Sequence, residues 1–318
     1  MNKNKLRIGI ALGSGSARGW AHIGVLKQLR DMGIRPDIIC GCSIGSIVGA
    51  AYAVNNLDKL ENWAVGLSKF EMMRYFELNT SLNGFVNQQK LKQCFHDNVC
   101  AEQQSIAGLK KQFATVATDL HSGREIWLNQ GSVIDAVWAS IALPGLFPPM
   151  AHEGRWLVDG GLVNPVPVSV CRAMGADIII AVNLNGNVLS SLKRKKTPAQ
   201  DTAEPHRTEG DDTVPEGNQN GLVSNMAASL KEYSSTLFPN NKDSNPIPSI
   251  IDAAVGSIYI MQDKITRSRL VGDPPEILLN PRVGNLGLLE FYRAKEAIEE
   301  GRQCVLRMQP EIEHIMEE

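Results

Sequence analysis

This chain of 318 residues has no excess of charge of either sign: 32 Lys and Arg stand against 34 Asp and Glu, a formal net charge of −2 at pH 7. No basic patch stands out along the sequence, so a nucleic-acid partner is not expected. Long hydrophobic runs are also missing. The N-terminal residues 1–5 are followed by an apolar run of only seven residues, which excludes a secretory signal or transmembrane helix there and favours a soluble cytoplasmic protein.

Metal-binding cysteine pairs are absent as well. The chain has six cysteines but no C-x-x-C pair, so the sequence predicts no zinc site, and reduced packing thiols are the default expectation. The content of hydrophobic residues, 43%, is in contrast ample for one large α/β domain.

The pentapeptide Gly41-Cys42-Ser43-Ile44-Gly45 is the most informative motif that is present. It follows an apolar run at residues 37–40, which predicts a buried strand, and precedes small residues at 47–53, which predict a closely packed helix. In that context G-x-S-x-G is typical of a nucleophile elbow, in which a serine sits on a tight turn with its Oγ pushed outward. The two glycines avoid a clash with the neighbouring strand and helix. Ser43 is therefore the candidate nucleophile.

A histidine base for this serine is not evident. In an α/β-hydrolase the triad follows the chain order Ser, acid, His. Of the six histidines, His206 falls in a polar stretch expected to lack regular structure and His314 falls in an acidic tail, so neither is well placed. The elbow also follows the second expected strand, which is earlier than that fold would place it. A Ser-His-Asp triad is disfavoured.

A carboxylate offers the alternative base. Residues 155–161 read Arg-Trp-Leu-Val-Asp-Gly-Gly, a short apolar strand that ends in Asp159 on a sharp turn. An aspartate at a turn is more often structural, and taken alone this pattern favours that interpretation. Together with the elbow and the loop described next, it favours Asp159 as a base.

A glycine-rich loop at residues 13–19 connects the first expected strand, 6–12, to a helix that ends near Gly33. Such a loop offers backbone N–H groups and the positive end of the helix dipole to an anion. A dinucleotide fingerprint is one interpretation, but the spacing is G-x-G-x-x-x-G and Asp37 begins the second strand instead of ending it. An oxyanion hole uses the same donors, and both interpretations stay open on the loop alone.

Four blocks, taken in order, resemble the patatin-like phospholipases, in particular the small bacterial branch akin to neuropathy-target-esterase domains. The blocks are the loop 13–19 with the helix start that follows it, the elbow at Ser43, the segment 139–144 (Ala-Ser-Ile-Ala-Leu-Pro), and Asp159-Gly160-Gly161. The resemblance covers residues 6 to about 185 closely and resumes more faintly after residue 251.

The resemblance implies an α/β fold, a patatin-like three-layer sandwich with a mostly parallel central sheet and helices on both faces. It also implies a Ser-Asp dyad without histidine, in which Ser43 is the nucleophile and Asp159 the proton acceptor. The amides of Gly15 and Ser16 carry over as the oxyanion hole, and no metal or other cofactor is required. The remaining motif residues are Gly13, Arg18, Gly19, Gly41, Gly45, Gly160 and Gly161.

The loop departs from the family pattern, because many relatives have glycine where this chain has Ser14 and Ser16. Backbone donors survive this change, but a serine held at positive φ would be strained. Two roles are open for Arg18, steadying a phosphate headgroup or tying the loop to a nearby carboxylate, and we favour the structural one. His22 is expected to be a packing histidine and Ser140 to shape the pocket floor.

The expected domain organisation has three parts. Residues 6–185 form the catalytic core, residues 190–245 are a polar and largely disordered insertion, and residues 251–308 supply helices and a strand that complete the core. Apolar residues between 60 and 78, including Trp63, Leu67 and Phe70, predict an amphipathic helix that covers the core, with a membrane-facing lid as the alternative.

We therefore expect a serine esterase that cleaves carboxylic esters of lipids and releases fatty acid. Its expected partners are a lipid or other acyl-ester substrate and, transiently, the inner face of the membrane. A thioesterase or acyltransferase with the same dyad, an interaction protein with little turnover, and a nucleotide-binding domain are the alternatives.

Overall fold

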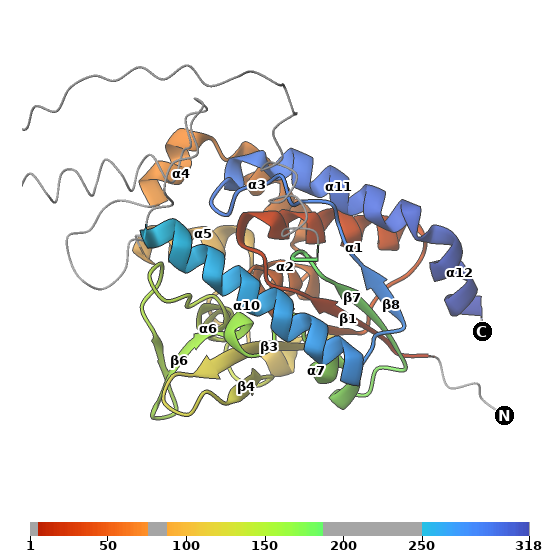
Figure 1. Ribbon diagram of the computed structural model, residues 1–318, viewed down its shortest axis with the longest axis horizontal. Coiled ribbons are helices and arrows are strands. Elements are labelled where there is room, and N and C mark those ends of the chain that lie inside the picture. The colour runs from red at the N-terminus through yellow and green to blue at the C-terminus, as the bar shows by residue number, and fades with distance from the viewer. Residues whose placement is uncertain (1–5, 76–87, 187–249, 318) are drawn as a thin grey trace, which may run out of the picture. The chain divides into compact units, whose positions relative to one another are not determined.

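The computed structural model describes residues 6–75, 88–186 and 250–317 (Figure 1). The chain divides into two compact units, Met1–Leu192 with Tyr259–Glu318, and Lys193–Ile258. All strands and the candidate site belong to the first unit. Of the second unit, only residues 250–258, at the start of helix α10, are described, and the predicted insertion at 190–245 lies outside the described residues.

One eight-stranded sheet forms the centre of the first unit, with the order β5-β6-β3-β2-β1-β7-β8 and with β4 paired to β3. The strands β8, β7, β1, β2 and β3 are parallel to one another, whereas β4 and β6 pair with β3 in antiparallel fashion and β5 pairs with β6 likewise. The bounds are β1 Ile8–Leu12, β2 Ile38–Cys42, β3 Gln112–Asp119, β4 Glu125–Leu128, β5 Met150–His152, β6 Arg155–Asp159, β7 Ile178–Val182 and β8 Ile277–Leu279.

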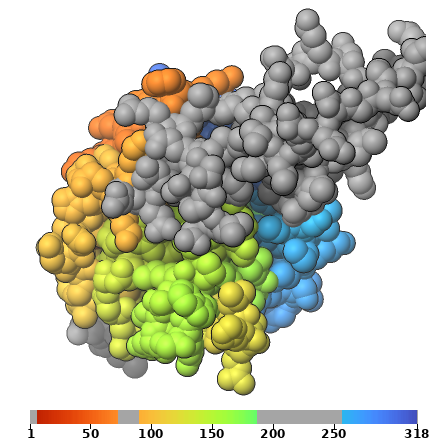
Figure 2. All heavy atoms as spheres, turned by 90° about the vertical axis from the view of Figure 1, so that its left-hand side faces the viewer, coloured from red at the N-terminus to blue at the C-terminus, as the bar shows by residue number. Residues whose placement is uncertain are grey.

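Helices cover both faces of this sheet. They are α1 Ala21–Asp31, α2 Ile44–Ala53, α3 Leu57–Gly66, α4 Lys69–Tyr75, α5 Gln88–Asn98, α6 Val133–Ser140, α7 Val168–Ala173, α10 Ile250–Gly272, α11 Ala294–Arg307 and α12 Gln309–Glu317. Short 3-10 helices are η1 Ser16–Trp20, η2 Ile106–Gly108, η3 Gly160–Leu162 and η4 Phe291–Arg293. On the face shown in Figure 2, the segment 88–186, coloured yellow to green, forms much of the visible surface, with the blue of α10 beside it.

Alternation along the strands creates two hydrophobic clusters, one on each face. In β1, Ile10 and Leu12 pack with side chains of α1, α2 and α11, whereas Ala11 between them packs with side chains of α7. Side chains in a strand point alternately to opposite faces, so a strand buried on both sides reads as a continuous apolar run. This arrangement confirms the predicted three-layer α/β sandwich.

Helices α1 and α11 approach each other more closely than side chains would allow. A Cβ added to Gly24 of α1 would lie 1.8 Å from the carbonyl oxygen of Ile298, and one added to Gly301 of α11 would lie 2.0 Å from that of Ala21. Glycine on each helix therefore lets the two backbones touch. Figure 1 shows the two helices side by side.

The sheet register explains how distant motifs meet. Leu12 at the end of β1 pairs with Gly41 of β2, so the loop after β1 and the elbow after β2 lie at the same edge of the sheet. Cys42 pairs with Val116 of β3, and the next residue of β3, Ala117, pairs with Asp159 of β6. Ser43 and Asp159 therefore flank β3 at the same level.

Three sequence expectations need correction. The segment expected as one helix over 60–78 is two helices, because α3 ends at Gly66 and α4 begins at Lys69; residues 76–78 lie outside the described residues. Ser68 and Glu71 form a reciprocal capping box: the Glu71 N–H donates to the Ser68 hydroxyl (3.2 Å) and the Ser68 N–H to the Glu71 carboxylate (2.7 Å). Helix α12 lies beyond the expected C-terminal part 251–308, and the three-residue strand β5 was not expected.

Candidate active site

Ser43 occupies a strained turn between β2 and α2. Its backbone has φ 54° and ψ −124°, a conformation that costs a non-glycine residue roughly 1–3 kcal/mol and persists only where neighbouring contacts enforce it. Those contacts are visible. The Ser43 N–H donates to the Ser140 hydroxyl (3.0 Å), and the Ser46 hydroxyl donates to the Ser43 carbonyl (2.6 Å). The start of α2 lies so close to β1 that a Cβ on Gly45 would come within 2.1 Å of the Leu12 carbonyl oxygen.

Asp159 ends β6 with both carboxylate oxygens occupied. The Ser43 hydroxyl donates to Oδ2 at 2.6 Å, and the Gly161 N–H donates to Oδ1 at 2.7 Å. The Thr118 hydroxyl donates to the Asp159 carbonyl (2.9 Å), which fixes the turn to β3. The structure thus brings together Ser43 and Asp159, which are 116 positions apart in the sequence.

Burial sets the acidity of this carboxyl group. Asp159 is 1% exposed, and loss of contact with water raises its pKa from 3.8 to about 6, although the hydrogen bonds from Ser43 and Gly161 lower it. The group is therefore ionised at neutral pH and is a stronger base than an ordinary aspartate.

The glycine-rich loop is held by the amides on either side of its centre. The N–H groups of Gly13 and Ser14 donate to the carbonyls of Val182 (3.1 Å) and Pro165 (2.8 Å), and that of Ala17 donates to Leu288 (3.0 Å). The N–H groups of Gly15 and Ser16 donate to no backbone carbonyl within the described residues.

The strain foreseen for serine in this loop is present at one position. Ser16 has φ 53°, in the left-handed region, whereas the φ of Gly15 is 167°, an extended value open to any residue. Ser16 also begins η1, so its N–H has no partner within that helix. Two N–H groups at a helix start that have no backbone acceptor in the described part of the chain form a suitable site for a negative oxygen.

Arg18 has partners other than the carboxylate we considered. It is 2% exposed, its Nε donates to the Gly15 carbonyl (3.3 Å), and its guanidinium carbon lies 4.4 Å from the ring centroid of Tyr259. Within the described residues it forms no ion pair with a carboxylate. A guanidinium this deeply buried is not presented to a lipid headgroup, so its role is structural.

His22 behaves as a packing residue. Its Nε2 lies 2.8 Å from the Gly13 carbonyl oxygen, to which the neutral ring donates. Burial lowers the pKa of His22 to about 4, so the ring is uncharged at neutral pH. Asp37 lies at the other end of β1, where its carboxylate accepts the Ile8 N–H (3.3 Å), so it is remote from the loop that a dinucleotide would occupy.

The chain is similar to proteins of one known family. A family model for patatin-like phospholipases matches residues 10–172, about half of the chain. The chain belongs to the patatin-like phospholipase family. An uncharacterized NTE family protein of Mycobacterium tuberculosis is 30% identical over 331 aligned positions, which cover 93% of this chain and 89% of that protein.

Two further relatives match a little over half of this chain and a small part of their own length. Lysophospholipase nte1 of Aspergillus fumigatus is 32% identical over 56% of this chain and 12% of its own length. Human patatin-like phospholipase domain-containing protein 6 is 30% identical over 56% of this chain and 13% of its own length. Together these relatives place the protein in the bacterial, NTE-like part of the patatin family.

An apolar cavity of about 100 Å³ opens at Ser43 and Ser16 of this patatin-like site. Its walls are side chains of α2, α3, α4 and α5, of the segment 141–147 and of the segment 289–291. Trp63 and Leu67, two of the apolar residues singled out from the sequence, line it, whereas Phe70 is 67% exposed. The contributions of α5 and of 289–291 had no signal in the sequence, because each supplies only one or two side chains.

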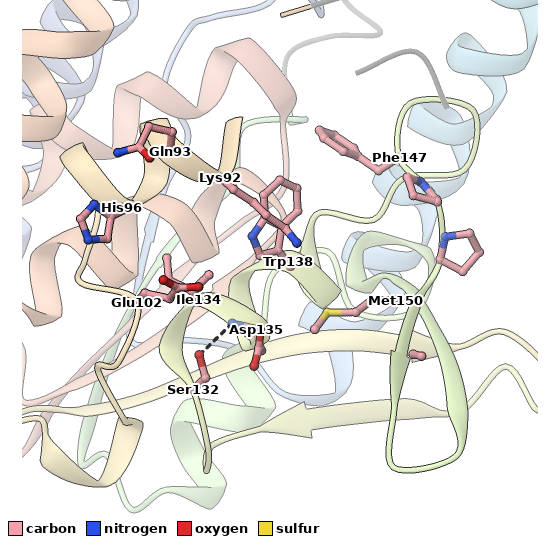
Figure 3. Close-up of a pocket in the computed structure, with 13 residues that line it drawn as sticks. Lys92, Gln93, His96, Glu102, Ser132, Ile134, Asp135, Trp138, Phe147 and Met150 are labelled. Atoms are coloured by element: carbon pink, nitrogen blue, oxygen red, sulfur yellow. Dashed lines mark hydrogen bonds between the residues drawn. The ribbon is translucent and has the colours of Figure 1, made fainter. Parts of the chain in front are cut away.

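A second and larger cavity, about 710 Å³, lies beyond Phe147, which lines both (Figure 3). Its lining is mixed, with Lys92 and His96 of α5, the carboxyl groups of Glu102 and Asp135, and apolar side chains such as Trp138. The dashed bond in Figure 3 is the N-cap of α6, where the Ser132 hydroxyl accepts the Asp135 N–H (3.2 Å). Neither Ser43 nor Asp159 faces this cavity, so its size does not make it the reaction site.

The described part of the chain contains no cluster of three or more His, Cys, Asp or Glu side chains that could hold a metal ion. The six cysteines are buried, as expected for packing thiols. Within the same residues no helix is both long and apolar enough to cross a membrane.

Proposed function

We propose that this protein is a serine-dependent acyl hydrolase that cleaves carboxylic esters of lipids, of the phospholipid or lysophospholipid class, and releases a fatty acid. The observation that carries the proposal is the 2.6 Å hydrogen bond from Ser43 Oγ to Asp159 Oδ2 beside an apolar cavity. Membership in a lipid-hydrolase family supports the same class of reaction.

The proposed cycle is acyl transfer in two halves. Ser43 Oγ attacks the ester carbonyl while Asp159 Oδ2 takes its proton, and the N–H groups of Gly15 and Ser16 stabilise the charge on the carbonyl oxygen. The bond to the alcohol then breaks, and Asp159 returns the proton to the departing oxygen. In the second half water attacks the acyl-serine, Asp159 takes a proton from it, and the fatty acid leaves as Ser43 regains a proton.

The desolvated carboxylate makes a dyad workable. Proton transfer from a serine hydroxyl to an ordinary aspartate is steeply uphill. Raising the pKa of Asp159 from 3.8 to about 6 reduces that uphill free energy by about 3 kcal/mol. Positioning and oxyanion stabilisation must supply the rest of the acceleration.

The pH dependence follows from the same carboxyl group. Asp159 accepts a proton only when ionised, so kcat/KM for a soluble ester is expected to rise with pH, to reach half its limit near pH 6, and to stay level above pH 7. Initial rates between pH 4 and 9, corrected for spontaneous hydrolysis, measure this profile. A midpoint near pH 4 would contradict a desolvated base, and a midpoint near pH 7 would point to a histidine.

We also propose a cytoplasmic protein that touches the membrane surface transiently. The exposed Phe70 on α4, next to the helix residues that line the apolar cavity, supports that contact.

The direct test combines a fluorophosphonate probe with hydrolysis of p-nitrophenyl esters of graded chain length. We expect the probe to modify Ser43, identified by peptide mass spectrometry, and Ser43→Ala to lose both labelling and turnover. Ser268→Ala, which removes an exposed hydroxyl on α10, is the matched control and should behave as wild type. A folded wild-type protein that neither labels nor hydrolyses would refute the proposed function.

The size of the cavity determines how much of the acyl chain of a p-nitrophenyl ester it can enclose. A volume of about 100 Å³ is smaller than the roughly 150 Å³ of a cavity that holds benzene, so it encloses only the first few carbons of an acyl chain.

A further inference from the structure

Helix α10 reaches the glycine-rich loop through one buried amide. The Ser14 hydroxyl donates to Gln262 Oε1 at 3.0 Å, and the Asn185 side-chain amide donates to the same oxygen at 3.2 Å. Gln262 is 5% exposed. Because an unpaired buried polar group is costly, these two bonds hold the loop and the segment after β7 in a fixed relation to α10.

The other end of the same side chain faces the turn that carries the candidate base. A Cβ on Gly161 would lie 2.4 Å from Gln262 Nε2, so the Gln262 amide packs directly against this glycine. The Gly161 N–H is the group that holds Asp159 Oδ1. Gln262 therefore contacts the oxyanion loop on one side and the Asp159 turn on the other.

Tyr259 lies three positions before Gln262, on the same side of α10. Its ring packs against the guanidinium of Arg18, and Arg18 in turn donates to the carbonyl of Gly15. Burial raises the pKa of Tyr259, and Arg18 and Ser16, which interact with its hydroxyl, partly offset that rise. Two residues of α10 therefore contact the loop. Gln262 binds Ser14, and Tyr259 interacts with Ser16 and, through Arg18, with Gly15.

The side chains of two loop residues meet α10. Ser14 donates to Gln262, and Ser16 interacts with the Tyr259 hydroxyl. Residues 259–262 lie beyond the stretch 10–172 that the family model matches. A serine hydroxyl can make a side-chain hydrogen bond, so both serines tie the loop to this helix.

We propose that Gln262, supported by Tyr259, is a positioning residue for the reaction: it holds the loop 13–19 so that the N–H groups of Gly15 and Ser16 point at the oxygen that becomes negative. The inference rests on the proposed function, since it assigns the support of that same oxyanion site. Displacement of such donors by about 1 Å can cost on the order of a hundredfold in rate, so a residue that acts only through the loop can have a large effect.

A double-mutant cycle tests this. Gln262→Leu and Ser14→Ala remove the two ends of one hydrogen bond, and each is expected to lower kcat by about ten- to a hundredfold with KM changed less than about twofold. The double variant should be no slower than the slower single variant, because both substitutions remove the same support. Ser14→Ala removes only one oxygen atom, so the cycle stays informative if Gln262→Leu folds poorly. Lys264→Gln, on the exposed side of α10, is the matched control and should retain wild-type kcat.

A second readout separates positioning from general damage. A trifluoromethyl ketone forms a tetrahedral adduct with an oxyanion, whereas an ether of the same chain length binds without one. The affinity for the ketone should fall in proportion to kcat in both variants, and the affinity for the ether should not change.

The possible results separate a failure of the positioning role of Gln262 from a failure of the proposed function. Suppose that turnover in wild type depends on Ser43. The positioning role would then be overturned if the losses in kcat of Gln262→Leu and Ser14→Ala multiply in the double variant, or if the single variants raise only KM. Either result would leave the proposed function standing. An equal loss of affinity for the ketone and for the ether would overturn the positioning role too. Wild-type turnover that survives Ser43→Ala would overturn both.

Discussion

Asp159→Asn is expected to lower kcat by about 10³- to 10⁴-fold while the protein stays folded. Asparagine has the size of aspartate, and its Oδ1 still accepts the Gly161 N–H that now binds the carboxylate at 2.7 Å. It cannot, however, take a proton from Ser43. The substitution therefore removes the base and keeps the turn, and single-turnover kinetics with a soluble ester measure the loss.

The stability of the same variant provides an internal check. The pKa of Asp159 is raised from 3.8 to about 6 in the folded protein, so folding favours the protonated form. The contribution of Asp159 to stability is then greatest below pH 4 and falls as the pH rises through 6, by up to about 3 kcal/mol. Asparagine lacks this dependence, so the variant should unfold at higher urea than wild type at pH 8, with the difference vanishing near pH 4.

Asp135→Asn is the control for this experiment, because Asp135 is an exposed carboxylate on α6 that lines the neighbouring cavity. It should leave kcat unchanged. An Asp159→Asn variant that is folded yet retains more than a tenth of wild-type kcat would rule out Asp159 as the base.

Gly24→Ala is expected to have the largest effect on stability, about 3 kcal/mol. The new Cβ would lie 1.8 Å from the carbonyl oxygen of Ile298, so α1 and α11 must move apart, and backbone atoms cannot yield as a flexible side chain does. The contact joins helices from the two ends of the chain, so the loss should appear in global unfolding. Urea unfolding followed by circular dichroism measures it.

Gly66→Ala is the matched control, because Gly66 ends α3 with no heavy atom within 4 Å of an added Cβ. Replacing that glycine should leave the free energy of unfolding unchanged or raise it by up to about 1 kcal/mol. The reciprocal Gly301→Ala should resemble Gly24→Ala, since its Cβ would lie 2.0 Å from the Ala21 carbonyl oxygen. Equal behaviour of Gly24→Ala and Gly66→Ala would show that the helices do not meet at these glycines.

Local signals predicted the parts of the fold that lie close together in sequence. The strand that ends in Asp159 occupies the predicted residues 155–159, and β1, Ile8–Leu12, falls within the predicted 6–12. The break between α3 and α4 also had a local signal, the Ser68–Glu71 capping box, which the run of apolar residues across it obscured. The three-residue β5 is too short to give a periodic pattern.

Long-range partners could not be predicted from the sequence. The Ser14–Gln262 bond joins residues 248 positions apart, and nothing around Gln262 in the sequence distinguishes it from other polar residues of a helix. The aromatic partner of Arg18 was missed for the same reason, since a cation next to a ring leaves no spacing rule in the sequence. Motifs thus indicated the reacting groups, but only the folded chain shows what holds them in place.

The large separation in sequence between α1 and α11 also affects how the protein is made. Trp20, just before α1, donates its ring N–H to the carbonyl of Phe291, which is 271 positions later in the chain. At roughly 5–20 residues per second, a ribosome needs about a quarter of a minute to a minute to cover that distance. For about the second half of that time, after residue 159 has been added, the nascent chain contains Ser43 and Asp159 but not all of the segments that cover and brace them. We therefore expect the proposed hydrolase activity to arise only after Phe291 and the helix that follows it have been made.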